Sequence, residues 1–314
     1  MRARTRRTKR RNILRSRRYK RKLRGGSQLI DKVVLLIPVY PHVYRLIYDI
    51  LKKMKDNNIT INILLVFSTQ EDYDSFEQKD RIKHAILDKS INDHSNDKFF
   101  QISAKRFCGY NYLLTQPYEY IISLDADIDI IPENFTHDKI MSKIQSRFTN
   151  KRIYGALTNF GDNVKSLVNY AFSDTEYYDK LKELTKDFTL YTCWTDLPVV
   201  MKNDISDFLS FIKYDKTQLN GKDFNFEAGF DFVYYDMFLL VKRDFKMIDI
   251  TSITPRLEYD INHEINKDNC KDIFEKLKAE QYTPGWIHSR IFKLDPTYFT
   301  SEGNFIIFHI DRTK

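Results

Sequence analysis

Three acidic residues alternate directly behind an apolar run, and this stretch has the clearest potential for chemistry in the sequence. Residues 120–124 are mostly β-branched or bulky, and Asp125, Asp127 and Asp129 follow before Pro132. Such a run is typical of a short buried strand. Carboxylates at its end need a cation or a basic partner, because unpaired buried charges are strongly disfavoured. Oxygen ligands suit hard cations such as Mg²⁺ or Mn²⁺, which often also hold substrate phosphates, so the stretch predicts a metal–diphosphate site.

The spacing of the three acids gives them different expected roles. Asp125 and Asp127 are two residues apart, so both point to the same face of a regular strand. Where the chain turns out of the strand, the two carboxylates can converge on one ion. Asp129 has the same parity, but an isoleucine flanks it on each side, which favours a structural or helix-capping role.

The elements that must position these acids begin near the N-terminus. Residues 32–40 predict a strand that is apolar on both faces and ends at Pro38, as in a parallel sheet covered on both sides. Apolar residues spaced by three and four over 42–54 predict an amphipathic helix, and 59–67 predict the next strand. Strand, helix and strand in this order form a right-handed βαβ unit.

The alternation continues up to the acidic stretch. We expect a helix over 72–89, a short strand over 99–102 and a helix over 105–114. This alternation predicts an α/β fold with a Rossmann-type, mostly parallel sheet flanked by helices. Ligands of such sheets bind outside the carboxyl ends of the strands, where the acids and the loop after Tyr40 would lie.

The second half of the chain carries a looser pattern of elements. We expect helices over 132–148 and 233–245, a strand over 153–158, and a final strand over 304–309 that ends in His309-Ile-Asp311. No internal repeat interrupts this series, so one large domain is the simplest organisation.

The positive charge of the chain is concentrated in its first residues. Residues 2–24 hold 14 Lys and Arg and no acid, which leaves 37 basic against 43 acidic side chains elsewhere. We therefore expect a disordered basic tail over 1–28, which contacts an anionic membrane or nucleic acid or serves only for solubility or targeting.

Cysteine usage and hydropathy bear on the compartment. The three cysteines form no C-x-x-C pair, so neither a disulfide framework nor a structural zinc site is expected. No apolar run reaches the ~18 residues of a membrane span, and no apolar signal core follows the basic residues. We expect a cytoplasmic protein that is not secreted and has no transmembrane segment.

Three segments together resemble a known enzyme family. Residues 37–40 (Ile-Pro-Val-Tyr), 105–111 (Lys-Arg-Phe-Cys-Gly-Tyr-Asn) and 121–127 (Ile-Ile-Ser-Leu-Asp-Ala-Asp) resemble the nucleotide-sugar half of GT-A-fold, D-x-D-containing glycosyltransferases. The resemblance covers residues 32–135 and extends to about 250. In style, the sequence is similar to the glycosyltransferases of large DNA viruses, which would place it in the host cytoplasm or the virion.

The resemblance implies an activity and a division of the domain. Residues 29–135 would bind the nucleotide sugar and 136–314 the acceptor. The implied reaction moves a sugar from a nucleoside-diphosphate sugar, UDP- or GDP-linked, to a glycan, protein or lipid acceptor with Mn²⁺ or Mg²⁺. The implied donor-binding residues are Pro38, Tyr40, Ser68, Lys105, Asn111 and Asp125.

The resemblance also implies the metal ligands. Asp125 and Asp127 would bind the ion, with Asp125 also meeting the ribose, and a late histidine often supplies a third ligand. Here that histidine would be His309, with His288 as the rival, and imidazole is an acceptable ligand of Mn²⁺. Ser68 stands where many members of the family carry an acid that contacts the base, and a cation at Lys105 or Arg106 could contact the diphosphate.

The catalytic base is less sharply indicated. An inverting transfer needs a carboxylate that takes the proton of the acceptor hydroxyl, and Asp231, Glu227 and Asp236 are the candidates. A retaining enzyme needs no such base, and these acids would then position the acceptor. Trp194 and Trp286 are candidates for stacking on sugar rings or for core packing.

Two other function classes remain open from the sequence. A nucleotidyltransferase that makes nucleotide sugars would share the sheet and the metal. It should carry a Gly-rich basic loop after the first strand, whereas residues 39–42 contain no glycine. A non-enzymatic protein that binds nucleic acid through its tail would lose all function when residues 1–28 are deleted.

Overall fold

The computed structural model describes ten stretches of the chain. They are residues 32–87, 98–157, 165, 168–169, 172–191, 196–212, 231–253, 265–282, 284–301 and 305–310. The predicted basic tail, Glu227, Trp194 and Asp311 lie outside the described residues, and so do the side chains of Phe308 and His309.

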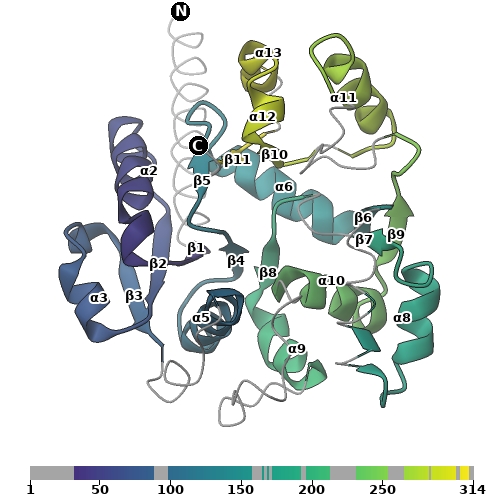
Figure 1. Ribbon diagram of the computed structural model, residues 1–314, viewed down its shortest axis with the longest axis horizontal. Helices are drawn as coiled ribbons and strands as arrows, with labels where there is room; N and C mark the ends of the chain where they lie inside the picture. The colour runs from purple at the N-terminus through teal and green to yellow at the C-terminus, as the bar shows by residue number, and fades with distance from the viewer. Residues whose placement is uncertain are drawn as a thin grey trace, which may run out of the picture.

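A five-stranded sheet forms the centre of the fold (Figure 1), with the strand order β3-β2-β1-β4-β8. Its strands are β1 (Val33–Pro38), β2 (Asn62–Phe67), β3 (Lys83–Ile86), β4 (Tyr120–Ser123) and β8 (Val199–Met201). The first four pair in parallel and β8 is antiparallel to β4. The predicted α/β class with a mostly parallel sheet is therefore confirmed.

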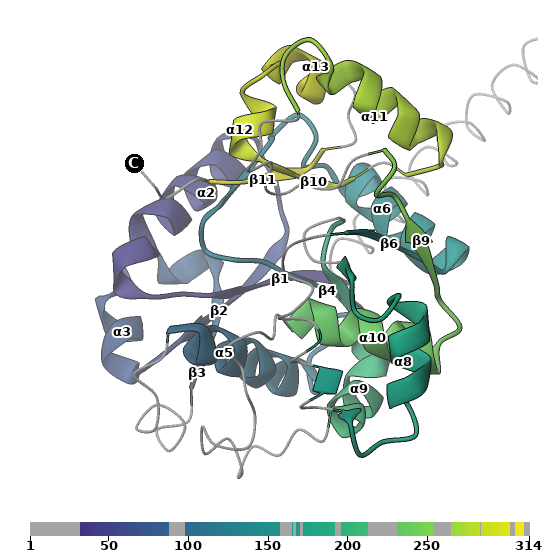
Figure 2. The same ribbon diagram turned by 45° about the vertical axis from the view of Figure 1, so that its right-hand side comes forward.

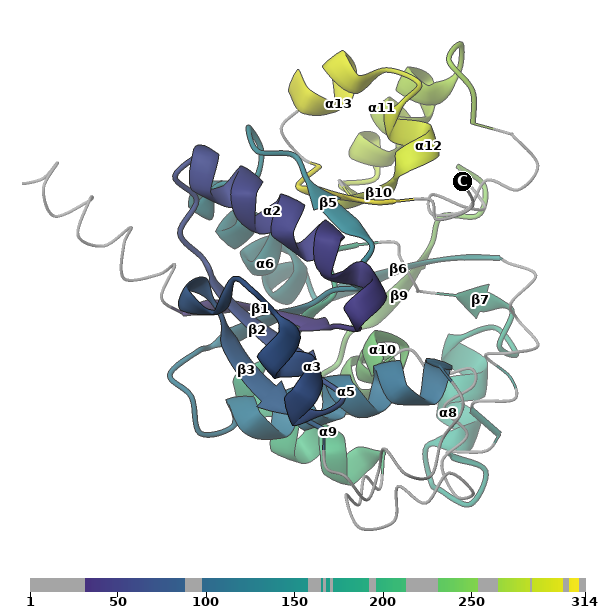
Figure 3. The same ribbon diagram turned by 60° about the vertical axis from the view of Figure 1, so that its left-hand side comes forward.

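Helices cover both faces of this sheet. Helix α2 (Tyr44–Asp56) lies on one side, while α5 (Lys98–Leu113) and α10 (Asp231–Lys242) lie on the other (Figures 2 and 3). All six residues of β1 are buried, as expected for a strand covered on both sides. The α2 residues at the predicted helical spacing, from Ile47 to Met54, pack into the same core.

Two small sheets extend the fold beyond the acidic stretch. β5 (Ile128–Ile130) pairs antiparallel with β11 (Ile307–His309), which pairs in parallel with β10 (Trp286–His288). β6 (Arg152–Leu157) pairs with β7 (Leu190–Tyr191) and β9 (Lys246–Asp249). Strand β11 confirms the predicted final strand, and it returns the chain to the acidic turn, because Ile310 N–H donates to the carbonyl of Asp127 at 2.7 Å.

Two predicted elements in the first half are wrong. The expected helix over 72–89 is a short helix, α3 (Gln70–Ser75), then the turn η2 (Lys79–Arg81) and strand β3. Thr69 caps α3, since its hydroxyl accepts from Asp72 N–H at 3.1 Å, and the chain extends at Phe76 because that ring is buried against Tyr44 and Phe67. The expected strand over 99–102 is the first turn of α5; four residues are too few to separate the two periodicities.

Apart from η1, the remaining described elements follow the acidic turn in the chain. Helix α6 begins after Thr136 and not at the predicted residue 132, while α10 and β6 lie close to the predicted ranges. The remaining elements are η1 (Pro41–Val43), α6 (His137–Asn150), α8 (Tyr178–Leu184), η3 (Lys202–Asp204), α9 (Ile205–Phe211), α11 (Cys270–Ala279), α12 (Ser289–Phe292) and α13 (Pro296–Ser301).

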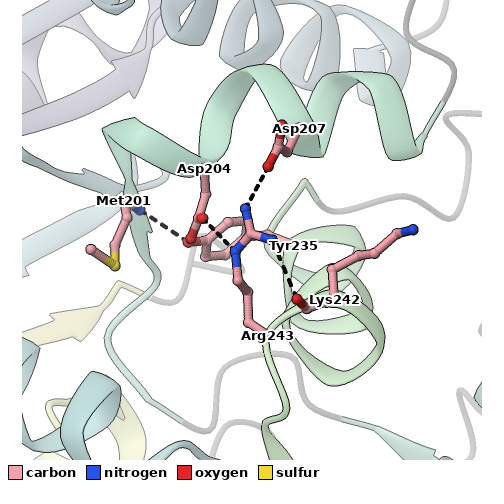
Figure 4. Close-up of polar contacts among 6 residues, drawn as sticks. All are labelled: Met201, Asp204, Asp207, Tyr235, Lys242 and Arg243. Atoms are coloured by element: carbon pink, nitrogen blue, oxygen red, sulfur yellow. Dashed lines mark hydrogen bonds and ion pairs between the residues drawn. The ribbon is translucent and has the colours of Figure 1, made fainter.

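A cluster of polar contacts ties the C-terminal end of α10 to the start of α9 (Figure 4). Arg243 donates from Nε to Asp204 at 2.8 Å and from a terminal nitrogen to Asp207 at 2.7 Å. The hydroxyl of Tyr235 donates to Asp204 at 2.8 Å and accepts from Met201 N–H at 3.1 Å. The cluster anchors the C-terminal end of α10, the helix that carries Asp231 at its other end.

Two observations concern the membrane and redox expectations. No helix in the described part of the chain has both the length and the apolar character needed to cross a membrane. Cys108 and Cys270 carry free thiols, and Cys193 lies outside the described residues.

Candidate functional site

The candidate site lies where β1 and β4 end. These neighbouring strands pair in parallel, with Leu36 opposite Ser123, and Leu124 N–H continues the pairing to the Leu36 carbonyl at 2.9 Å. Residues 39–40 and 125–127 therefore leave the sheet at the same edge, as the sequence predicted. The first half of α5 crosses this edge and brings a lysine and an arginine to it.

Lys105 lies at the β1 side of this edge and is fully buried. Its ammonium donates to the Val39 carbonyl at 2.6 Å and lies 3.3 Å from the centroid of the Tyr40 ring. Burial lowers the pKa of Lys105 to about 7, against the opposing charge of Asp72. The lysine therefore fixes the backbone and the ring of the residues that follow β1.

The other predicted donor residues on this side gather around Tyr40. Its half-buried ring stacks on the exposed His42, with centroids 5.7 Å apart and an interplanar angle of 24°. Pro38 is buried at the end of β1, and Ser68 is half-buried directly after β2. Because Val39 N–H donates to the Val66 carbonyl at 3.0 Å, the two strand ends lie next to each other.

Asn111 is the predicted donor residue that the structure places elsewhere. Helix α5 runs from the site back along the sheet, and Asn111 is exposed near its far end. Gly109 in the same motif serves packing, since a Cβ there would lie 2.3 Å from Leu36 Cδ1. The motif therefore contributes Lys105 and Arg106 to the edge and uses its later residues against the sheet.

Arg106 links the acidic turn to α10. Its fully buried guanidinium forms an ion pair with Asp125 and a second one, at 2.9 Å, with Asp231. One cation thus serves two carboxylates that are far apart in the sequence. A planar guanidinium suits such a bridge because its donors have a fixed geometry.

Asp231, a predicted catalytic base, lies beneath the site. It has no exposed surface, and it accepts hydrogen bonds from the Tyr110 hydroxyl and, at 2.9 Å, from the Ser123 hydroxyl. Burial, and then the neighbouring charge of Asp231, raise the pKa of Tyr110 well above its usual value. In this arrangement an acceptor hydroxyl cannot reach the Asp231 carboxylate, which instead holds Arg106 in place.

Asp236, the second described candidate base, faces another direction. It lies five residues along α10 from Asp231, which is about 140° around the helix. It is buried and forms an ion pair with Arg147 of α6. Burial opposes the charged form of Arg147, yet the charges of Asp236 and Asp196 raise the pKa of the guanidinium. Asp236 therefore joins α10 to α6.

The structure separates the roles of the remaining acids in the turn. Asp127 is only 7% exposed and follows Asp125 at the edge. Asp129 lies in β5, forms an ion pair with Lys53 of α2, and accepts from Ile130 N–H at 2.8 Å. These contacts agree with the structural role expected for Asp129.

A divalent cation fits this donor set with help from a substrate. Asp125 and Asp127 supply carboxylates from one turn, and the cation Arg106 is shared with a second acid. Within the described stretches, no group of three or more His, Cys, Asp or Glu could hold a metal ion by itself. Further ligands would thus come from substrate oxygens and water, which is a common arrangement for Mg²⁺.

The two candidate histidine ligands lie on paired strands. His309 is opposite Ile128 in β11, so its backbone lies beside the acidic turn. His288 lies opposite His309 in β10 and is buried; its Nδ1 accepts from Arg290 N–H at 3.2 Å and caps α12. Trp286 is buried in the core, so packing is the role its position supports.

The network around Asp231 is the part of the site that sequence reasoning missed. Arg106 and Tyr110 are four residues apart and share one face of α5, which is a signal that the sequence contains. Ser123 is the last residue of β4 and carries no pattern of its own. Their common partner comes from more than a hundred residues later, and spacing cannot show such a contact.

Comparisons with known proteins show only a distant likeness. No protein-family model and no curated protein sequence matches the chain. A solved structure described as mannose-1-phosphate geranyltransferase from Thermus thermophilus is similar at a TM-score of 0.33 and 10% identity, over 70% of this chain and 69% of that one.

The mannosyltransferase Ktr4p from S. cerevisiae is similar at a TM-score of 0.32 and 16% identity, over 65% of this chain and 62% of that one. Its complex with GDP is similar at a TM-score of 0.29 and 14% identity. At these scores the likeness supports no inference about activity, so function rests on the geometry of the site.

Proposed function

We propose that this protein is a metal-dependent glycosyltransferase. It would move a sugar from a nucleoside-diphosphate sugar to a glycan, protein or lipid acceptor. One observation carries the proposal: the ends of β1 and β4 bring an aromatic and cationic cluster beside two carboxylates in one turn. This is the combination that a nucleotide with a metal-bound diphosphate requires.

The cluster after β1 supports binding of the nucleoside. Tyr40 and His42 offer aromatic surface, and Ser68 offers a hydroxyl at the neighbouring strand end. Lys105 contacts the Tyr40 ring and the Val39 carbonyl, so it holds both residues in place at the edge.

The turn after β4 supports binding of the metal. Asp125 and Asp127 would hold Mn²⁺ or Mg²⁺, with His309 as the proposed third ligand. When bound, the ion would offset the charge of the departing nucleoside diphosphate. Arg106 would orient Asp125, and Asp231 would in turn orient Arg106.

A binding screen tests the proposal. The full chain is heated with UDP-, GDP- and CMP-sugars, with and without Mn²⁺, and the melting temperature is recorded. We expect at least one donor to raise it only when Mn²⁺ is present. Asp127→Asn should remove the metal dependence, whereas Asp138→Asn should keep it, because the Asp138 side chain is 99% exposed on α6. No metal-dependent shift with any donor would refute the proposal.

A further inference from the structure

A third strand end reaches the candidate site from the opposite direction. Strand β8 runs antiparallel to β4, with Val199 opposite Ile122, and the Pro198 carbonyl accepts from Ser123 N–H at 2.9 Å. The residues that enter β8 therefore lie at the edge where β4 ends. Asp196 precedes Pro198 by two residues, so it lies just beyond this last contact at the same edge.

The order of the strands shows on which side of the site Asp196 lies. Along the sheet the order is β2, β1, β4 and β8, so Tyr40, the acidic turn and Asp196 follow one another at one edge. The nucleoside cluster lies on one side of Asp125 and Asp127, and Asp196 lies on the other. An acceptor that attacks a sugar held at the acidic turn would approach from the side away from the nucleotide.

Asp196 is held rigidly through one of its two oxygens. Its Oδ1 accepts from Leu197 N–H at 2.7 Å and from Gly285 N–H at 3.4 Å. Gly285 packs tightly here: a Cβ on it would lie 3.3 Å from Leu197 Cβ, 3.7 Å from Asp196 Oδ1 and 3.8 Å from Lys143 Cδ. Across the described residues, no group donates a hydrogen bond to Oδ2.

Exposure separates Asp196 from the other candidate bases. Asp231 has no exposed surface, and Asp236 is 5% exposed; both are ion-paired with arginine. Asp196 is half-buried, so a hydroxyl can reach it. Among the acids that the structure describes at this edge, it combines a fixed position, an oxygen without a hydrogen-bond donor and access from solvent.

The charges that face Asp196 come from α6 and β6. Lys143 and Arg147 on α6 are both within electrostatic range of its carboxylate, and so is Tyr154 of β6. Burial lowers the pKa of Lys143 to about 8 and the charge of Asp196 opposes this shift. Asp196 is therefore flanked by basic side chains of α6.

We infer that Asp196 is the base that takes the proton of the acceptor hydroxyl, an inference that rests on the proposed function. As the acceptor oxygen forms its bond to the anomeric carbon, the proton passes to Asp196 Oδ2. The bond from that carbon to the diphosphate oxygen breaks, and its electron pair leaves with the nucleoside diphosphate. The protonated Asp196 then releases the proton to solvent. A single displacement of this kind inverts the configuration of the sugar.

Donor hydrolysis tests this role without a known acceptor, because water can take the acceptor's place. The full-length Asp196→Asn and Asp196→Ala variants are compared with wild type and with Asp187→Asn, whose side chain is 76% exposed. Each is given Mn²⁺ and the nucleotide sugar that gives the largest thermal shift, and nucleoside diphosphate release is measured. We expect kcat to fall by about 10²–10⁴-fold in both Asp196 variants, with an unchanged KM and thermal shift.

Chemical rescue separates a base from a structural residue. Added formate should restore part of the kcat of Asp196→Ala and leave that of wild type unchanged, since a small carboxylate can occupy the space of the lost one. Wild-type rates in Asp196→Asn, loss of donor binding in the variants, no rescue by formate, or retained configuration in the released sugar would each overturn the assignment. If wild type itself binds no donor with metal, the proposed function fails and this inference fails with it.

Discussion

The two ends of α10 are both fixed by an arginine that bridges two aspartates, but they differ in burial. At the N-terminal end, Arg106 is fully buried between Asp125 and Asp231. At the C-terminal end, Arg243 is 33% exposed, and one of its partners, Asp207, is 65% exposed. The same type of ion pair is thus buried at the N-terminal end of α10 and partly exposed to solvent at the C-terminal end.

The difference in burial indicates different roles for the two ends of α10. A buried ion pair gives little net stability, because desolvation of the charges offsets their attraction. An apolar cluster would hold the N-terminal end of α10 at least as well. Under the proposed function Asp125 is a metal ligand, and the ion pair with Arg106 would keep its carboxylate fixed at the edge of the sheet. At the C-terminal end, the partly exposed ion pairs of Arg243 serve to anchor the helix.

Removal of the buried arginine should have the largest effect. Arg106→Met leaves Asp125 and Asp231 without their shared cation, and breaking such a buried pair costs about 3–5 kcal/mol of unfolding free energy. Urea denaturation followed by circular dichroism measures it. A loss below that of the exposed Arg243→Met variant would contradict the contrast between the two ends.

A smaller loss is expected when one hydrogen bond to Asp231 is removed. Tyr110→Phe deletes a donor to a buried carboxylate and should cost about 1.5–3 kcal/mol. Tyr177→Phe is a matched control, because its hydroxyl accepts a hydrogen bond from the exposed ammonium of Lys242. Equal stability of the two variants in the same denaturation assay would show that the Asp231 network is not desolvated.

The pH dependence of stability distinguishes the buried lysine beside Arg106 from the arginine at the C-terminal end of α10. The pKa of Lys105 is lowered to about 7 by burial, so between pH 7 and 10 the unfolded chain binds a proton that the folded chain lacks. Stability from this group therefore rises with pH, by at most about 1.4 kcal/mol per pH unit. Arg243 contributes no such slope: burial opposes its charge, but bonds to Asp207 and Asp204 raise its pKa.

Unfolding curves of wild type and Lys105→Met between pH 6.5 and 9.5 measure this slope. The difference between the two proteins should grow in favour of wild type as the pH rises. Lys182→Met, which alters a half-exposed lysine, should run parallel to wild type. Parallel curves for Lys105→Met would mean that Lys105 keeps its ordinary pKa.

The smallest loss of stability is expected at the C-terminal end of α10. Arg243→Met removes ion pairs that are partly exposed, and such pairs contribute about 0–1 kcal/mol. The same denaturation assay measures it, repeated in 1 M NaCl, which should reduce the difference from wild type further. A loss above about 2 kcal/mol would show that the Arg243 cluster is as important to the fold as the Arg106 network.

Local sequence pattern predicted the parts of the site that depend on one strand. The apolar runs before Tyr40 and Asp125 place both at the carboxyl edge, because a buried run and its exit need no information from elsewhere. The start of α5 was misplaced, since residues 99–102 fit either period. Asn111 was assigned to the site by its motif, although the helix carries it away from the edge.

Contacts between distant segments lay beyond what pattern can supply. Asp231 was a candidate catalytic base in the sequence, but the packing of α10 against β4 buries it. The sequence did not indicate Asp196 as a site residue, because it belongs to no motif. The position of Asp196 depends on the antiparallel pairing of β8 with β4. The sequence of a three-residue strand gives almost no indication of its direction.

The pairing of β5 with β11 has a consequence for the order of assembly. Residues 128–130 directly follow the acidic turn, yet their partner strand is residues 307–309, so the turn lacks this neighbour until residue 309 has been synthesised. Contacts of such long sequence separation form late, because the intervening loop must be closed first. A nascent chain can therefore pair β1 with β4 before the acidic turn gains β11 as its neighbour.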